Sequence, residues 1–229
     1  MKVEFLLIFG AVLVIVSLFS IAIQQNRRKQ DKQLRVFKSF GFRSIESVTT
    51  LTDRVNQLYS WKQSETRHTL RNVYHKTISN GDMYFFKFED SDSDHFYLAI
   101  LSSELNLPQF FIYPKLEVGG IAGNVLNKAL LWAISKIGTT IDFPQDSRFQ
   151  DEYIVNALNP SAVRQFLTAD VLRQISQLKG IAVQAEGSLL LFFQLNESGS
   201  ISQEFISQQV NQAVRVLQIF ASDDEYLFS

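Results

Sequence analysis

The side chains in this sequence that could do chemistry are carboxylates and histidines, because the chain contains no cysteine. Asp90, Asp92 and Asp94 have the spacing of the first ligands of an EF-hand calcium loop, which then needs a glycine and, at its twelfth position, a carboxylate. His95 and Leu101 occupy those two positions. The run is therefore expected to be a solvated acidic turn, with weak cation binding as the minor alternative.

The remaining candidates are equally incomplete as sites. The three histidines are His68, His75 and His95. His68 and His75 flank a predicted strand, and no cysteine or close carboxylate completes a zinc set with them, so ordinary surface or half-buried histidines are expected. Residues 119–123, Gly-Gly-Ile-Ala-Gly, open a predicted helix, whose N-terminus could attract an anion. They lack the Lys-Ser/Thr of a phosphate-binding loop and the G-x-G-x-x-G spacing. A hinge is the expected role, with ligand binding as the alternative.

Four carboxylates lie close together in sequence: Asp142, Asp146, Asp151 and Glu152. Paired carboxylates perform acid–base catalysis only when their surroundings separate their pKa values, which a sequence does not reveal. We expect Asp142 to hydrogen-bond the backbone or to pair with Arg164. The sequence therefore predicts no catalytic, cofactor-binding or metal-binding residue.

A long apolar stretch near the start of the chain predicts where the protein resides. The nineteen residues from Phe5 to Ile23 carry no charge. As a helix they would reach about 28 Å, close to the ~30 Å thickness of the hydrocarbon core. A cleavable signal peptide would need a basic start and a small-residue cleavage site, whereas Lys2 is offset by Glu4 and Gln24–Arg27 offers no such site. An uncleaved transmembrane anchor over residues 1–23 is predicted.

Basic residues follow this anchor directly. They are Arg27, Arg28, Lys29, Lys32 and Arg35, with Lys38 and Arg43 beyond. Because positive charge favours the cytoplasmic side, the rest of the chain is predicted to be cytoplasmic, at the inner membrane. The orientation of the chain in the membrane is sufficient to explain these basic residues, and recognition of anionic lipid is the alternative. With a net charge of −1, the composition gives no reason to expect nucleic-acid binding.

The anchor leaves enough chain for one domain with an aromatic-rich core, since the sequence has 20 Phe. We divide it into a basic linker (24–44), an α+β domain (45–220) and an acidic tail (221–229). Helical spacing predicts helices at 24–40, ended by Gly41, and at 45–60, 119–137 and 201–220. Strands are expected at 70–78, 83–88, 95–101 and 110–113 as an antiparallel meander of three or four strands, with a hairpin turn at Asn80-Gly81. Pro108 and Pro114 are expected to bracket the strand at 110–113. A further strand is expected at 153–155, and a closing hairpin over 181–195. Residues 141–144 are expected to be extended, and Asn159 and Thr168 to cap two helices.

Short motifs in the middle of the chain resemble a family of bacterial single-pass membrane-anchored proteins to which no activity is assigned. These are Leu107–Pro114, Ile141–Pro144, Phe149, Tyr153–Val155, Val163–Thr168 and Leu172. The likeness covers about residues 70–195 and departs at Arg148 and Ala169, where the family pattern has Glu and Pro. It implies a bacterial envelope setting.

These observations favour a non-enzymatic, membrane-tethered cytoplasmic domain without a cofactor, which binds a partner protein or a second copy of itself or organises an assembly. Tethering raises the local concentration, so weak contacts suffice. Two alternatives stay open at this point: an enzyme with a carboxylate site around Asp142, and a sensor of anionic lipid surfaces built from the basic stretch and the helix that carries Trp132.

Overall fold

The computed structural model describes residues 24, 28, 30–46, 48–60, 67–89, 96–115, 138–178, 180–193 and 201–221. Several predictions lie outside these residues: the anchor at 1–23, the acidic run 90–94 with His95, the helix at 119–137, and the tail after Ala221. In the part that is described, no helix is long and apolar enough to cross a membrane. The chain divides into two compact units, Met1–Phe42 and Arg43–Ser229.

The first unit contains a helix that includes residues 30–39 and ends at a glycine, as predicted. Gly41 adopts φ +82°, a left-handed conformation in which a side chain would be strained. The N–H of Phe42 donates to the carbonyl of Phe37 at 3.1 Å, and that of Gly41 donates to Lys38 at 3.0 Å. The rings of Phe37 and Phe42 meet edge to face at 5.9 Å. This is a Schellman motif with its hydrophobic contact, so local sequence sets the end of the helix.

The second unit is built on one antiparallel sheet, and the described strands occur in the order β1-β2-β3-β4-β9-β8-β5-β7-β6. The strands are β1 (Arg43–Ile45), β2 (Leu70–Ile78), β3 (Gly81–Phe88), β4 (Tyr97–Leu101), β5 (Leu107–Pro114), β6 (Thr139–Ile141), β7 (Tyr153–Ala157), β8 (Ala182–Gly187) and β9 (Leu189–Phe193). The helices are α2 (Thr49–Leu58), α4 (Ser147–Glu152), α5 (Pro160–Phe166), α6 (Ala169–Ile175) and α7 (Gln203–Ala221). The predicted α+β class with a mostly antiparallel sheet is confirmed for this unit.

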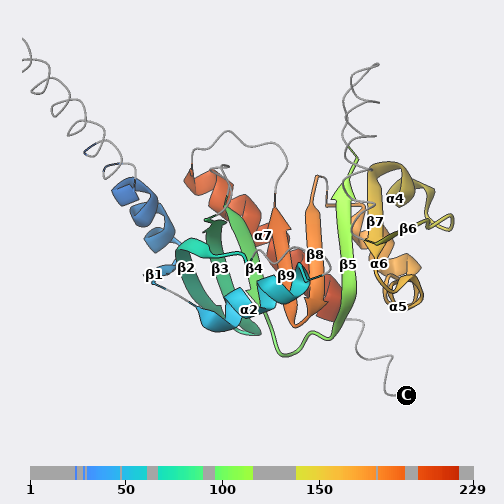
Figure 1. Ribbon diagram of the computed structural model, residues 1–229. Helices are drawn as coiled ribbons and strands as arrows, with labels where there is room; N and C mark the ends of the chain where they lie inside the picture. Colours follow the sequence, from blue (N-terminus) through green and yellow to red (C-terminus); the bar gives the residue numbers. More distant parts are fainter. Residues whose placement is uncertain are drawn as a thin grey trace, which may run out of the picture. The chain divides into compact units, whose positions relative to one another are not determined.

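The sheet is covered on both faces (Figure 1), with α2 on one side and α7 on the other. Leu51, Val55 and Leu58 of α2 are fully buried against alternate residues of the strands, among them Phe86 and Phe111. The opposite face packs against α5 and α7, and its centre is an aromatic group in which Phe110 lies 5.8 Å from Phe166 and 5.6 Å from Phe220. Alternation of side chains across the strands therefore builds two apolar layers.

The predicted meander of three or four strands is confirmed with three strands, β2, β3 and β4, and the fourth candidate lies elsewhere in the sheet. β5 does not pair with β4, because the β8–β9 hairpin lies between them: β4 pairs with β9, and β8 pairs with β5. β5 is also longer than predicted and includes Pro108 and Pro114. Both prolines therefore lie within the strand and do not bracket it as predicted.

Two further elements differ from prediction. The predicted helix at 45–60 starts too early: Ile45 pairs with Val73 in the short strand β1, and the helix begins only at Thr49. Helix α4 was not predicted. The predicted caps are confirmed: Asn159 accepts from the N–H of Ala162, and Thr168 from that of Val171. The predicted closing hairpin and last helix are also present as β8–β9 and α7.

Candidate functional site

Three of the four carboxylates considered for catalysis have separate structural roles. Asp146 caps α4 by accepting from the N–H of Phe149 at 2.9 Å. Asp142 accepts from the side chain of Gln150 at 3.4 Å, and Glu152 pairs with Arg148 at 3.3 Å. Asp142 is exposed, and its side chain contacts Gln150 instead of the expected backbone or Arg164. The arrangement therefore positions helix α4 and gathers no acid–base pair.

The two described histidines lie apart and have different partners. His75 contacts Asp82 at 2.7 Å and stacks on Tyr84, with ring centres 4.9 Å apart. His68 packs between aromatic rings and donates its backbone N–H to Asn56 at 2.7 Å. Within the described ranges, no group of three or more His, Asp or Glu side chains could hold a metal ion. Both histidines therefore stabilise local structure at strand β2 and its start.

The predicted membrane-proximal basic residues are partly described. Arg28, Lys32 and Arg35 lie on the helix of the first unit, and all three are exposed. Arg27 and Lys29 lie outside the described residues. Helical geometry places Arg28, Lys32 and Arg35 on one face because they are spaced by four and three residues. They therefore form a basic stripe, the name used for these three residues below.

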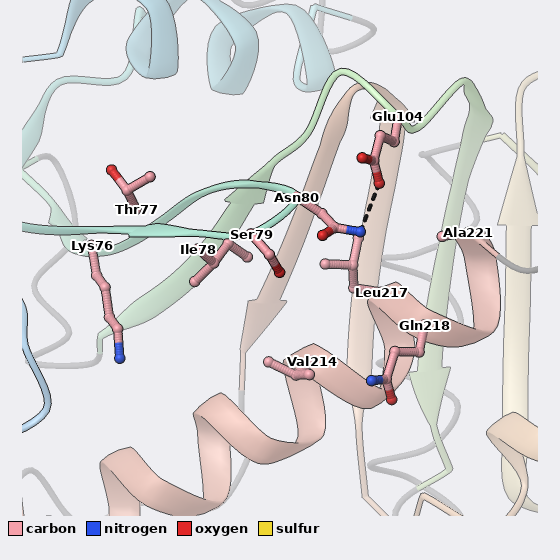
Figure 2. Close-up of a pocket in the computed structure, with 10 residues that line it drawn as sticks. All are labelled: Lys76, Thr77, Ile78, Ser79, Asn80, Glu104, Val214, Leu217, Gln218 and Ala221. Atoms are coloured by element: carbon pink, nitrogen blue, oxygen red, sulfur yellow. Dashed lines mark hydrogen bonds between the residues drawn. The ribbon is translucent and has the colours of Figure 1, made fainter.

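A groove lies in the second unit between the β2–β3 hairpin and helix α7. We call it the hairpin groove. Figure 2 shows Ile78 and Ser79 pointing from the hairpin toward α7, which contributes Val214 and Leu217. Its volume is about 670 Å³, within the usual range for ligand sites. The full lining is Lys76, Thr77, Ile78, Ser79, Asn80, Glu104, Val214, Leu217, Gln218 and Ala221. It combines an apolar floor with a polar rim.

The hairpin that forms one wall of this groove is held in place by two contacts. Asn80 donates from its side-chain amide to Glu104 at 2.7 Å (Figure 2), which joins the turn to the loop after β4. Gly81 adopts φ +142°, and a Cβ there would lie only 2.2 Å from the carbonyl oxygen of Leu101. The sequence predicts this turn from Asn80-Gly81 but not the groove, because the other wall comes from helix α7, which begins about 120 residues later.

Polar side chains also gather beneath α2, in a cluster that the sequence analysis missed. Gln184 donates to the hydroxyl of Tyr113 at 2.9 Å, and both side chains are buried. Burial raises the pKa of Tyr113 and raises that of Tyr59 well above its usual value, so both phenols stay neutral. Gln109 donates to the carbonyl of Leu58 at 3.1 Å, at the end of α2. The feature of the sequence that could have indicated this cluster is a glutamine, Gln184, among the apolar residues of β8.

Glu186 extends this cluster toward the surface. Its carboxylate accepts long hydrogen bonds of 3.5 Å from Gln57 of α2 and from Gln109 of β5. Burial raises the pKa of Glu186, while the hydrogen bond from Gln57 and the charge of Arg54 lower it. These contacts hold the C-terminal end of α2 on the sheet. The cluster therefore has a structural role: it attaches the end of α2 to the sheet. The hairpin groove is the better candidate for a binding site.

Comparison with known proteins gives one informative result. No family model matches the sequence, and no curated protein matches it. Among solved structures, the mycobacterial trehalose monomycolate transport factor A, TtfA, is similar with a TM-score of 0.51. The sequences are 12% identical, and the match covers 84% of this chain and 94% of that chain. At this identity the likeness concerns the fold alone: the chain shares its α+β architecture with a mycobacterial transport factor.

Proposed function

We propose that this chain is a membrane-tethered cytoplasmic domain that binds a partner protein and does not itself catalyse a reaction. The observation that supports this most is the shared architecture with a transport factor over 94% of that protein's chain. The uncharged stretch Phe5–Ile23 and the basic residues behind it supply the tether. A tethered domain meets membrane partners at high local concentration, so a modest binding surface is sufficient.

The hairpin groove is the surface that we propose for the partner. Its floor offers Val214 and Leu217, and its rim offers side-chain donors and acceptors from Ser79 and Gln218. Apolar contact with a few polar anchors is the usual composition of a binding site. The Asn80–Glu104 hydrogen bond fixes the position of the hairpin wall, which lowers the ordering cost of binding.

Site-specific photo-crosslinking of the full chain in intact cells tests this function. A photoreactive residue replaces Gln218 in the groove and, as the matched control, Arg164, which is exposed on α5. We expect one discrete crosslinked species from position 218 and none from position 164. Adding Val214→Glu places a charge on the groove floor and should abolish that species.

Equal crosslinking at both positions, or crosslinking that survives Val214→Glu, contradicts the groove as the binding surface. Far-ultraviolet circular dichroism of the Val214→Glu protein tests whether its fold is retained, which separates loss of binding from loss of structure. A reproducible absence of any crosslinked protein at several groove positions, including Ser79, contradicts the partner-binding function itself.

A further inference from the structure

The basic stripe is an exposed charged surface that the groove does not explain. Arg28, Lys32 and Arg35 are exposed, whereas Gln33 and Phe37 of the same helix are only 8% and 0% exposed. The helix therefore has a cationic face distinct from the side that is protected from solvent. Three charges spread over eight residues cover about 10 Å of helix length.

The charge of this face is not neutralised within the described helix. None of the ion pairs formed among the described residues involves Arg28, Lys32 or Arg35. Asp31 is the single acidic residue on residues 30–39, and Lys38 adds a further cation. The face thus keeps a net positive charge, and it begins five residues after Ile23, where the uncharged stretch ends.

We propose that the basic stripe binds the headgroups of anionic phospholipids, so that this helix lies with its cationic face against the inner surface of the membrane. The proposal rests on the proposed tether, which would bring the stripe to the headgroup region. Guanidinium groups suit phosphate because they donate in a fork, and a cation near an anionic surface is stabilised by ~1 kcal/mol. One such contact corresponds to roughly a fivefold preference for an anionic lipid over a zwitterionic one.

Spin-label electron paramagnetic resonance of the full chain reconstituted in phosphatidylcholine bilayers tests the proposal. Trace spin-labelled phosphatidylglycerol or phosphatidylcholine reports the motionally restricted lipid at the protein boundary, and the ratio of the two gives the lipid preference. We expect about a fivefold preference for phosphatidylglycerol in the unaltered protein. The preference should fall to about one in the triple variant Arg28→Gln/Lys32→Gln/Arg35→Gln. In the unaltered protein it should decrease with added salt, because salt screens the contact between the charges.

A control variant removes the same number of positive charges from the second unit. Arg148→Gln/Arg164→Gln/Arg173→Gln changes three exposed arginines on α4, α5 and α6 and should leave the preference unchanged. Glutamine has a helix propensity close to that of lysine and arginine, so the helix should persist. Equal preference for the two lipids in the unaltered protein, or equal loss in both triple variants, overturns the proposal. If neither labelled lipid shows a restricted component, the chain has no membrane-embedded part, and the tether fails instead.

Discussion

Replacing Gly81 tests the geometry of the hairpin groove most sharply. An added methyl group there would meet both an unfavourable backbone conformation and a steric clash. Its φ of +142° lies in a region that L-residues rarely adopt. A Cβ at this position would lie 2.2 Å from the carbonyl oxygen of Leu101 and 3.0 Å from the Cα of Ser102. Both neighbours are backbone atoms, so the β3–β4 pairing itself must shift to admit an alanine.

The expected cost of Gly81→Ala follows from these two terms. The unfavourable backbone conformation costs about 1–3 kcal/mol, and forcing extra volume into a packed site costs a similar ~1–3 kcal/mol. Gly187→Ala is the matched control. Gly187 also adopts a left-handed conformation in a hairpin turn, at φ +56°, but a Cβ there would have no atom within 4 Å. Only the backbone term of about 1–2 kcal/mol applies there.

Urea denaturation of the full chain in detergent micelles, followed by circular dichroism, measures both free energies of unfolding. We expect Gly81→Ala to lower the free energy by at least ~1 kcal/mol more than Gly187→Ala does. Crosslinking from Gln218 should decrease in Gly81→Ala as well, since the hairpin wall moves. Equal losses of stability in the two variants would refute the close approach of Gly81 to the backbone of β4.

Three further predictions concern the packing around the sheet. Tyr113→Phe should lower the free energy of unfolding by about 1–3 kcal/mol, because the buried amide of Gln184 loses the hydroxyl of Tyr113 as an acceptor. Urea denaturation measures this change, and an unchanged midpoint contradicts it. Thr168→Ala should cost ~1 kcal/mol through loss of the cap on the N–H of Val171, whereas Thr168→Ser should restore most of it. Burial raises the pKa of Tyr153 from 10.0 to about 12. The stability that its neutral phenol contributes is complete below pH 10 and is lost as pH rises through about 12, so unfolding midpoints should fall less steeply with pH in Tyr153→Phe.

The elements that sequence reasoning predicted are those whose cause is local. Asn159 and Thr168 accept hydrogen bonds from backbone groups three residues away, and Gly41 and Gly81 occupy conformations that favour glycine. Each of these depends on a few consecutive residues, so the residue types alone are sufficient.

The errors arise where distant segments decide the outcome. Strand β1 contains three residues and exists because it pairs with β2, about thirty residues later in the chain. The insertion of the β8–β9 hairpin between β4 and β5 joins segments that are about 90 residues apart. An alternating apolar pattern fixes which face of a strand is buried but not which strand lies beside it. The hairpin groove was unpredictable for the same reason.

The proposed tether and orientation can be tested by one measurement, a pair of reporters fused after Ser229. A fluorescent protein that folds only in the cytoplasm should fluoresce, and alkaline phosphatase, which is active only outside the cytoplasm, should be inactive. Both fusions should fractionate with membranes and retain residues 1–23. Phosphatase activity without fluorescence, or a mature protein that begins near Gln24, would contradict a retained anchor with the domain on the inner face.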